Sequence, residues 1–231
     1  ASMFFANARG VEDRINAEVA ARPELEHVLL QCSAVNDIDA SALESLEAIA
    51  SRLKEAKPEF IWAGVIALEG MLLLDAMKKI DYPAPQMFHY LPSPGPMLKS
   101  PDAKNALAVT IFEQHAPMMS NFGATEFAKT FNERAAKAGL PDTQVDTQAA
   151  ASFAAWQVLE AAVNGAKSFD DKVLAAWLKK NTVNTIQGPM RFDGPSNYGD
   201  DLSKIKQVQN GEWVVIWPRA SAKPGVKHLL P

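Results

Sequence analysis

The sequence predicts an α/β fold with a mostly parallel sheet, flanking helices and a C-terminal antiparallel hairpin. Between Glu59 and Leu91, two short runs rich in aromatic and β-branched residues flank an apolar pattern of helical period. This order is typical of two parallel strands joined by a helix. Asn210-Gly211 separates two further strand patterns, and this dipeptide favours a two-residue hairpin turn. Three longer helical patterns lie between these segments.

The first 56 residues have the order strand, helix, strand, helix. Residues 2–6 form a short apolar run, an amphipathic helix is expected over residues 8–21, and residues 27–35 have the pattern of a buried strand. The second helix begins with Ser41 and Glu44, which have the spacing of a capping box. These elements make no complete sheet. We therefore expect residues 1–56 and 57–231 to be two segments that share one core.

The central unit continues directly after the Lys57-Pro58 join. Residues 59–65 are expected to form a strand, residues 68–80 a helix and residues 83–91 a second strand. Residues 92–101 are rich in turn formers and are expected to form a loop. A further strand is predicted over residues 106–113, so the parallel sheet continues beyond the loop.

Three helices and a hairpin complete the chain. The helices are expected over residues 123–140, over residues 146–165 and from Ser168 onward, with Gly139 and Gly165 at the ends of the first two. A strand is expected over residues 185–192, and the hairpin over residues 202–217. The second helix should bury an apolar face, made of Phe153, Trp156, Leu159 and Val163.

Composition excludes several classes of function. The net charge is −4 without a basic cluster, which argues against nucleic-acid binding, and the apolar runs are too short to span a bilayer. The first residues show no secretory signal, and the single Cys32 excludes an internal disulfide. The four histidines lack metal-ligand spacing, and Ser41 has no nucleophile elbow around it. We therefore predict no cofactor, no metal and no enzymatic activity.

Two resemblances cover the chain. Residues 1–56 resemble the N-terminal half of a STAS domain of the kind attached to SulP-type anion transporters, on FFANA from Phe4 and CSAVNDIDASALESLEAI from Cys32. Residues 58–218 resemble the C-terminal half of a type I periplasmic solute-binding protein of the branched-chain amino-acid ABC transporter kind. That second resemblance rests on ALEGMLLLDAMKKIDYPAPQMFHYLPSPGP from Ala67, AASFAAWQVLEAAV from Ala150 and the stretch from Ala175 to Pro218.

The expected ligand site lies at the carboxyl ends of the parallel strands, where open α/β sheets bind ligands. Three loops, residues 36–41, 66–69 and 92–97, should meet there. The candidate ligand-binding residues near them are Trp62, Glu69, His89, Tyr90, Asp37 and Asp39. The alternative interpretation is structural: Asp39 caps a helix, Glu69 sits in a first helical turn, and His89 packs within a strand.

The binding-protein resemblance also implies that free amino acids are poor ligands. The positions that hold the ligand ammonium in that family correspond to Val65 and Leu91, and neither side chain can pair with a charged amine. An apolar or aromatic acid is expected instead, bound weakly because the resemblance covers only half of a two-lobed site.

Three interpretations of function remain open. The first is a non-enzymatic solute-binding domain of the ABC transporter kind, incomplete and joined to a STAS-like segment. The second is a STAS-type regulatory module whose partner is a transporter or another protein. The third is an engineered or recombined chimera without a native function. The compartment follows the same division, periplasmic by the binding-protein segment and cytoplasmic by the STAS-like segment.

Overall fold

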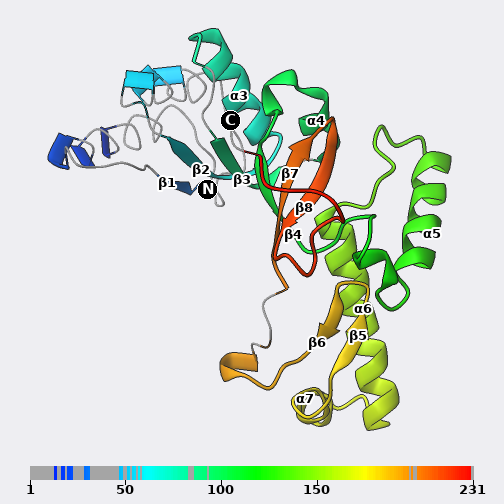
Figure 1. The fold of residues 1–231 in the computed structure, drawn as a ribbon. Helices are drawn as coiled ribbons and strands as arrows, with labels where there is room; N and C mark the ends of the chain where they lie inside the picture. The colour runs from blue at the N-terminus through cyan, green and yellow to red at the C-terminus, as the bar shows by residue number, and fades with distance from the viewer. Residues whose placement is uncertain are drawn as a thin grey trace. The chain divides into compact units, whose positions relative to one another are not determined.

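The computed structural model describes most of the chain after residue 58 and short stretches before it (Figure 1). The expectations for residues 2–6, for the capping box at Ser41 and for Cys32 lie outside the described residues. Elements are named as in Figure 1. The described residues are 13–14, 17–18, 20–22, 29–31, 47–48, 51–52, 54–55, 57, 59–82, 86–92, 94–197, 199 and 202–229.

The chain divides into two compact units. Unit 1 contains Ala1–Ala108, Gln207–Trp213 and His228–Pro231, and unit 2 contains Val109–Lys206 and Val214–Lys227. The chain passes between the units within three strands, β4 (Leu107–Thr110), β7 (Lys204–Gln209) and β8 (Glu212–Trp217). That residues 1–56 and 57–231 are segments sharing one core stays a prediction.

The predicted strand–helix–strand unit is confirmed in unit 1. Strand β2 (Phe60–Ala67) pairs in parallel with β3 (Gln86–Pro92), and helix α3 (Glu69–Lys79) connects them. Strand β1 (Leu29–Gln31) pairs in parallel with the other side of β2. The strand order in the sheet is β1-β2-β3-β4-β7-β8. The predicted α/β class with a mostly parallel sheet is therefore correct.

Helix α3 covers one face of this sheet because strand side chains alternate between faces. Ile61, Ala63 and Val65 of β2 are buried in one cluster with Leu73 and Met77 of α3. Gly70 allows the helix to approach closely, since a Cβ atom at this position would lie 2.8 Å from Nδ1 of His89. Any larger residue at position 70 would force the helix and the strand apart.

The expected loop at residues 92–101 is instead largely helical. Helix α4 spans Pro94–Lys99, and a 3₁₀ turn follows at Pro101–Ala103. The prolines misled the prediction, because proline is tolerated in the first turn of a helix, where its missing N–H has no partner to lose. Met97, which is fully buried, anchors α4 in the core of unit 1.

The three predicted helices of unit 2 are confirmed as α5 (Ala124–Lys137), α6 (Thr147–Ala166) and α7 (Asp171–Leu178). Local capping explains two of the starts. The Asp146 carboxylate accepts a hydrogen bond from the Ala149 amide at 2.6 Å, and the Asp170 carboxylate accepts from the Lys172 and Val173 amides. These bonds satisfy amides that have no partner within the helix.

The buried face of α6 differs from the prediction. The residues it buries are small, Ala150, Ala154 and Ala162, each at most 1% exposed. Trp156 and Leu159, which we expected to be buried, are 69% and 43% exposed. Helix α6 carries apolar residues on nearly every side, so the period of the sequence could not select a face. Small side chains let neighbouring elements approach, and this decided the packing.

The strand expected over residues 185–192 is a small hairpin. Strands β5 (Val183–Thr185) and β6 (Gly188–Met190) pair antiparallel around a two-residue turn. The Thr185 hydroxyl accepts a hydrogen bond from the Gln187 amide and donates one to the Gly188 carbonyl. Gly188 has a φ of 113°, a conformation that favours glycine and permits the reversal.

The C-terminal hairpin is confirmed at the predicted turn. Asn210 and Gly211 join β7 to β8 with φ values of 52° and 78°, both in the left-handed region that the turn requires. Trp213 is buried in the core cluster of unit 1, whereas Trp217 is 58% exposed.

Replacing Gly211 by Val should lower the free energy of unfolding by about 1–3 kcal/mol, because a β-branched residue is strained at positive φ. The space around a Cβ at this position is open, with no atom within 4 Å, so the loss would come from the backbone and not from a clash. Denaturant titrations would measure it. The control is Gly211→Asn, since Asn tolerates this conformation and should cost less. Equal stabilities of the Val variant and the wild type would contradict the assigned turn.

Candidate functional site

Two of the predicted site residues meet on one face of the unit 1 sheet. Trp62 of β2 lies beside Phe88 of β3, and their rings stack with centroids 5.9 Å apart. The ring of Tyr90 lies 6.1 Å from Trp62. We call Trp62, Phe88 and Tyr90 the aromatic row. Tyr90 is 39% exposed, so the row reaches the surface. Asp37 and Asp39 lie outside the described residues.

The structure separates His89 from the aromatic row. His89 directly follows Phe88 in β3, so its side chain lies on the opposite face of the sheet, against Gly70 of α3. It is fully buried, and neither ring nitrogen has a hydrogen-bond partner among the described residues. Burial lowers the pKa of His89 from 6.5 to about 4, so the ring is neutral at pH 7.

Glu69 lies at the carboxyl end of β2, where the prediction placed it, but its carboxylate has a structural partner. Its Oε2 atom accepts a hydrogen bond from the Ile66 amide at 2.9 Å and so closes the turn from β2 into α3. Partial burial raises the pKa of Glu69, and the backbone hydrogen bond opposes this effect. The structure thus brings Trp62 and Tyr90 together, places Glu69 at the strand end, and sets His89 apart.

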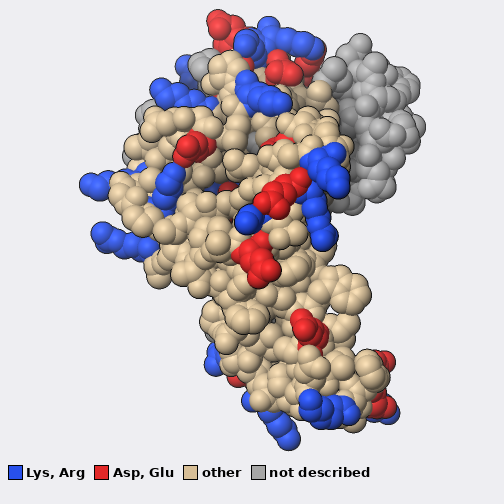
Figure 2. Space-filling view, turned by 90° about the vertical axis from the view of Figure 1, so that its right-hand side faces the viewer, with Lys and Arg blue, Asp and Glu red and all other residues tan. Residues whose placement is uncertain are grey.

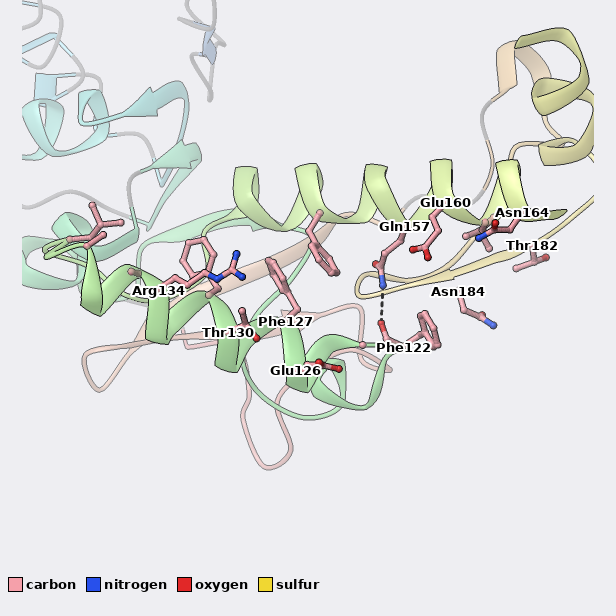
Figure 3. A pocket seen from close by; sticks show the side chains of 18 residues that line it. Phe122, Glu126, Phe127, Thr130, Arg134, Gln157, Glu160, Asn164, Thr182 and Asn184 are labelled. Carbon is pink, nitrogen blue, oxygen red and sulfur yellow. Dashed lines mark hydrogen bonds between the residues drawn. The ribbon is translucent and has the colours of Figure 1, made fainter. Parts of the chain in front are cut away.

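The sequence analysis did not anticipate a cavity of about 1030 Å³ in unit 2 (Figure 3). Its walls come from α5, α6 and the start of β5, and its size is at the upper end of the range for small-molecule sites. Phe127 and Phe153 stack on each other in its wall, with ring centroids 4.3 Å apart, and Phe131 lies 6.0 Å from Phe127. Phe122 completes the aromatic lining. A flat apolar ligand would find stacking surfaces here.

A few polar groups border this aromatic lining. Figure 3 shows Arg134 and Glu126 extending from α5, and Gln157 and Glu160 extending from α6. Gln157 is held at both ends, because its Nε2 donates to the Phe122 carbonyl at 3.3 Å and its Oε1 accepts from the Ile186 amide at 2.8 Å. The exposed Arg134 guanidinium forms no hydrogen bond or ion pair with the described residues. It is therefore available to a ligand.

The sequence carried part of the signal for this cavity. Phe127 and Phe131 have the spacing of one helix face, and both also pack against the buried cluster of unit 2, so this spacing does not distinguish a cavity wall from core packing. The cavity exists because α5 and α6 stand apart along this face, and a helix periodicity says nothing about the distance between two helices. Arg134 carried no motif around it.

Other kinds of site find no support in the described part of the chain. It contains no group of three or more His, Cys, Asp or Glu side chains that could hold a metal ion. None of its helices combines the length and the hydropathy needed to cross a bilayer. On the face shown in Figure 2, basic and acidic side chains are interspersed among broad neutral areas, unlike a surface for nucleic acid.

A family model described as periplasmic binding protein matches residues 33–212. A search of curated proteins found no match. The match begins within the segment that we likened to a STAS domain and runs across residues 56–58. The comparisons thus support the binding-protein resemblance and give no support to a STAS segment or a chimera. Strand-helix alternation is common to many α/β families, so the order of elements alone does not separate the two resemblances.

Solved structures share the fold at low identity. A leucine-binding protein from Thermotoga maritima is 19% identical with a TM-score of 0.60, over 82% of this chain and 52% of that one. A benzoate-bound solute-binding protein of an ABC transporter from Rhodopseudomonas palustris is 16% identical with a TM-score of 0.59, over 84% and 52%. An extracellular ligand-binding receptor from the same species is 18% identical with a TM-score of 0.58, over 78% and 54%. The chain spans about half the length of these proteins.

Proposed function

Because the chain belongs to the periplasmic binding protein family, we propose that it binds a small solute without converting it, as the solute-binding component of an ABC-type transporter. The family match over residues 33–212 is the observation that carries this proposal. The interpretation of residues 1–56 as a STAS-type regulatory segment rests on sequence motifs alone. If the chain binds none of the solutes tested below, the STAS-type regulatory interpretation would be favoured over solute binding.

The ligand class that best fits the unit 2 cavity is an aromatic monocarboxylic acid. The ring would stack on the wall formed by Phe127 and Phe153, which already pair face to face. The carboxylate would take hydrogen bonds from the fork of the Arg134 guanidinium, whose geometry matches a carboxylate in two parallel bonds. Glu126 and Glu160 lie on the same border and would repel a second carboxylate.

Two related structures support this ligand class. Solute-binding proteins of Rhodopseudomonas palustris are described in complex with benzoate and with 3,4-dihydroxybenzoic acid. Both compounds have one ring and one carboxylate. The cavity provides phenylalanine side chains for the ring and Arg134 for the carboxylate. Their identities to this chain are 16%, so the likeness transfers the fold, and the ligand class rests on the cavity itself.

The aromatic row of unit 1 is the second place where a ring could stack. Trp62 lies in the first half of β2, the neighbouring Tyr90 lies in the second half of β3, and Glu69 follows the carboxyl end of β2. Arg134 borders the unit 2 cavity and can hold a carboxylate, so we place the acid there. Variants of Arg134 and of Trp62 separate the two locations.

We expect Arg134→Gln to weaken benzoate binding by about ten- to a hundredfold, because one charge-assisted contact contributes about 1.5–3 kcal/mol. A ligand-observed NMR titration measures the weak affinities involved. Lys137→Gln is the matched control, since it removes the same charge from the same last turn of α5 without lining the cavity. Loss of binding in Trp62→Ala, with Arg134→Gln unaffected, would move the site to the aromatic row.

Leucine, isoleucine and valine should bind no more tightly than about 1 mM, an affinity of only about 4 kcal/mol. The positions that match the family's ammonium contacts carry Val65, which is buried, and Leu91, and an apolar side chain cannot pair with a charged amine. Isothermal titration calorimetry decides the point. A micromolar dissociation constant for any of the three would show that an amine-binding group lies elsewhere in this chain.

A further inference from the structure

The unit 2 cavity is larger than benzoate requires. Its volume of about 1030 Å³ suits a drug-sized molecule, whereas benzoate has a single ring. A ring stacked on Phe127 and Phe153 leaves uncovered the part of the cavity that Gln157 and Asn164 of α6 line. These two residues are two helical turns apart, or about 10 Å. The cavity therefore has room for a longer ligand.

The two ends of the cavity differ in chemistry. Figure 3 shows Arg134 at one end and Asn164 and Thr182 at the other, with Phe127 between them. Arg134 lies about two turns from Phe127 along α5, and Asn164 lies about three turns from Phe153 along α6, in the opposite direction. The cavity is thus cationic at one end, aromatic in its middle and polar at the other end.

Three neutral side chains, Asn164, Thr182 and Asn184, form this polar end. All three are exposed, and their side chains form no hydrogen bond with the described part of the chain. Amide and hydroxyl groups can both donate and accept hydrogen bonds, as a hydroxyl group of a ligand does. Glu160 lies on the Phe153 side of Asn164 in α6, and its carboxylate accepts a hydrogen bond but repels an anion. The polar end therefore fits a hydroxyl group and disfavours a second carboxylate.

We propose that the unit 2 cavity binds an elongated aromatic monocarboxylic acid that carries a hydroxyl group at the end opposite its carboxylate. As this assignment depends on the proposed function, the carboxylate stays at Arg134 and the first ring stays on Phe127 and Phe153. A second ring continues past Gln157, whose side chain is fixed by its two hydrogen bonds. The hydroxyl group of the ligand then reaches the polar end.

Probes of increasing length test the proposal in ligand-observed NMR titrations of the full chain. Benzoate has one ring, para-phenylbenzoate adds a second, and its hydroxyl derivative carries a hydroxyl group at the far end of the second ring. We expect the second ring to tighten binding at least about tenfold, because more apolar surface is buried. The hydroxyl group should tighten it a further two- to tenfold or so, the contribution of about one hydrogen bond.

A second ring could tighten binding at any apolar surface, so variants locate the far end of the ligand. A chain with both Asn164→Ala and Asn184→Val should lose the gain from the hydroxyl group. Benzoate, which does not reach this end, is the internal control and should bind this variant and the wild type equally well. Both positions are exposed, so the variant should fold, and circular dichroism checks that it does.

The charge of Glu160 provides a second measurement. The derivative of para-phenylbenzoate with a carboxylate in place of the hydroxyl group should bind more weakly than para-phenylbenzoate itself. Glu160→Gln should narrow this difference, because it removes the repelling charge. Glu133→Gln is the matched control, since it removes the same charge from an exposed position that does not line the cavity.

The outcomes separate this proposal from the proposed function. If Arg134→Gln weakens benzoate binding but para-phenylbenzoate binds no more tightly than benzoate, the longer ligand is wrong and the proposed function stands. A hydroxyl gain that persists without Asn164 and Asn184, or equal effects of Glu160→Gln and Glu133→Gln, would also overturn the proposal. If none of the probes binds, or Arg134→Gln affects none of them, the proposed function fails as well.

Discussion

Replacing Lys206 by Met should destabilise unit 2 by about 3–5 kcal/mol, the usual cost of leaving one member of a buried ion pair without its counter-charge. Nζ of Lys206 lies 2.6 Å from Oε1 of Glu113, and the two side chains are only 5% and 12% exposed. With Met at position 206, the Glu113 carboxylate would remain buried beside an apolar side chain. Denaturant titrations at pH 7 would measure the loss.

A double-mutant cycle separates the cost of breaking the pair from the net contribution of the pair. Glu113→Leu combined with Lys206→Met removes both charges, and we expect the double variant to recover most of the lost stability, because apolar replacements of buried pairs are often nearly neutral. Lys129→Met is the control. Its pair with Glu133 has a distance of 4.0 Å and side chains 75% and 66% exposed, so the change should cost less than about 1 kcal/mol. Similar losses at Lys206 and Lys129 would contradict the argument from burial.

Local signals predicted the fold well. The strands around α3, the start of α6 at Asp146 and the turn at Asn210-Gly211 all depend on residues within a few positions of each other. Such local signals do not depend on how the rest of the chain packs. Prolines at residues 94 and 96 failed as a loop signal because proline is compatible with the first turn of a helix as well as with a loop.

The candidate site was harder to predict because it depends on tertiary distances. Trp62 and Tyr90 lie side by side, since parallel strands in register bring them to one face. His89 was grouped with them by proximity in sequence, but a strand turns consecutive side chains to opposite faces. The cavity beside Arg134 depends on the separation of α5 and α6, for which the sequence contained no signal. The buried face of α6 was also not predictable from the sequence, because its apolar residues cover more than one face.

The stability of unit 1 should fall as the pH is lowered from 6.5 to 4, because of His89. The pKa of this ring is about 4 in the folded protein against 6.5 as the ordinary value, with burial as the cause. Between these two values the unfolded chain binds a proton that the folded chain does not, so acid favours unfolding. The stability is fully present above pH 6.5. The total loss at pH 4 and below is about 3 kcal/mol, at 1.36 kcal/mol for each unit of pKa difference.

His89→Leu should remove this pH dependence, since it replaces the buried imidazole on the α3 face with a side chain of similar size that does not titrate and needs no hydrogen bond. Denaturant titrations at pH 7 and pH 4.5 measure the effect, and comparison with the wild type cancels the contributions of all other groups, including the opposing one from Glu69. Met87→Leu, on the same face of β3, controls for repacking of the core and should keep the wild-type dependence. If His89→Leu and the wild type lose equal stability between the two pH values, the buried neutral ring is not what limits unit 1 in acid.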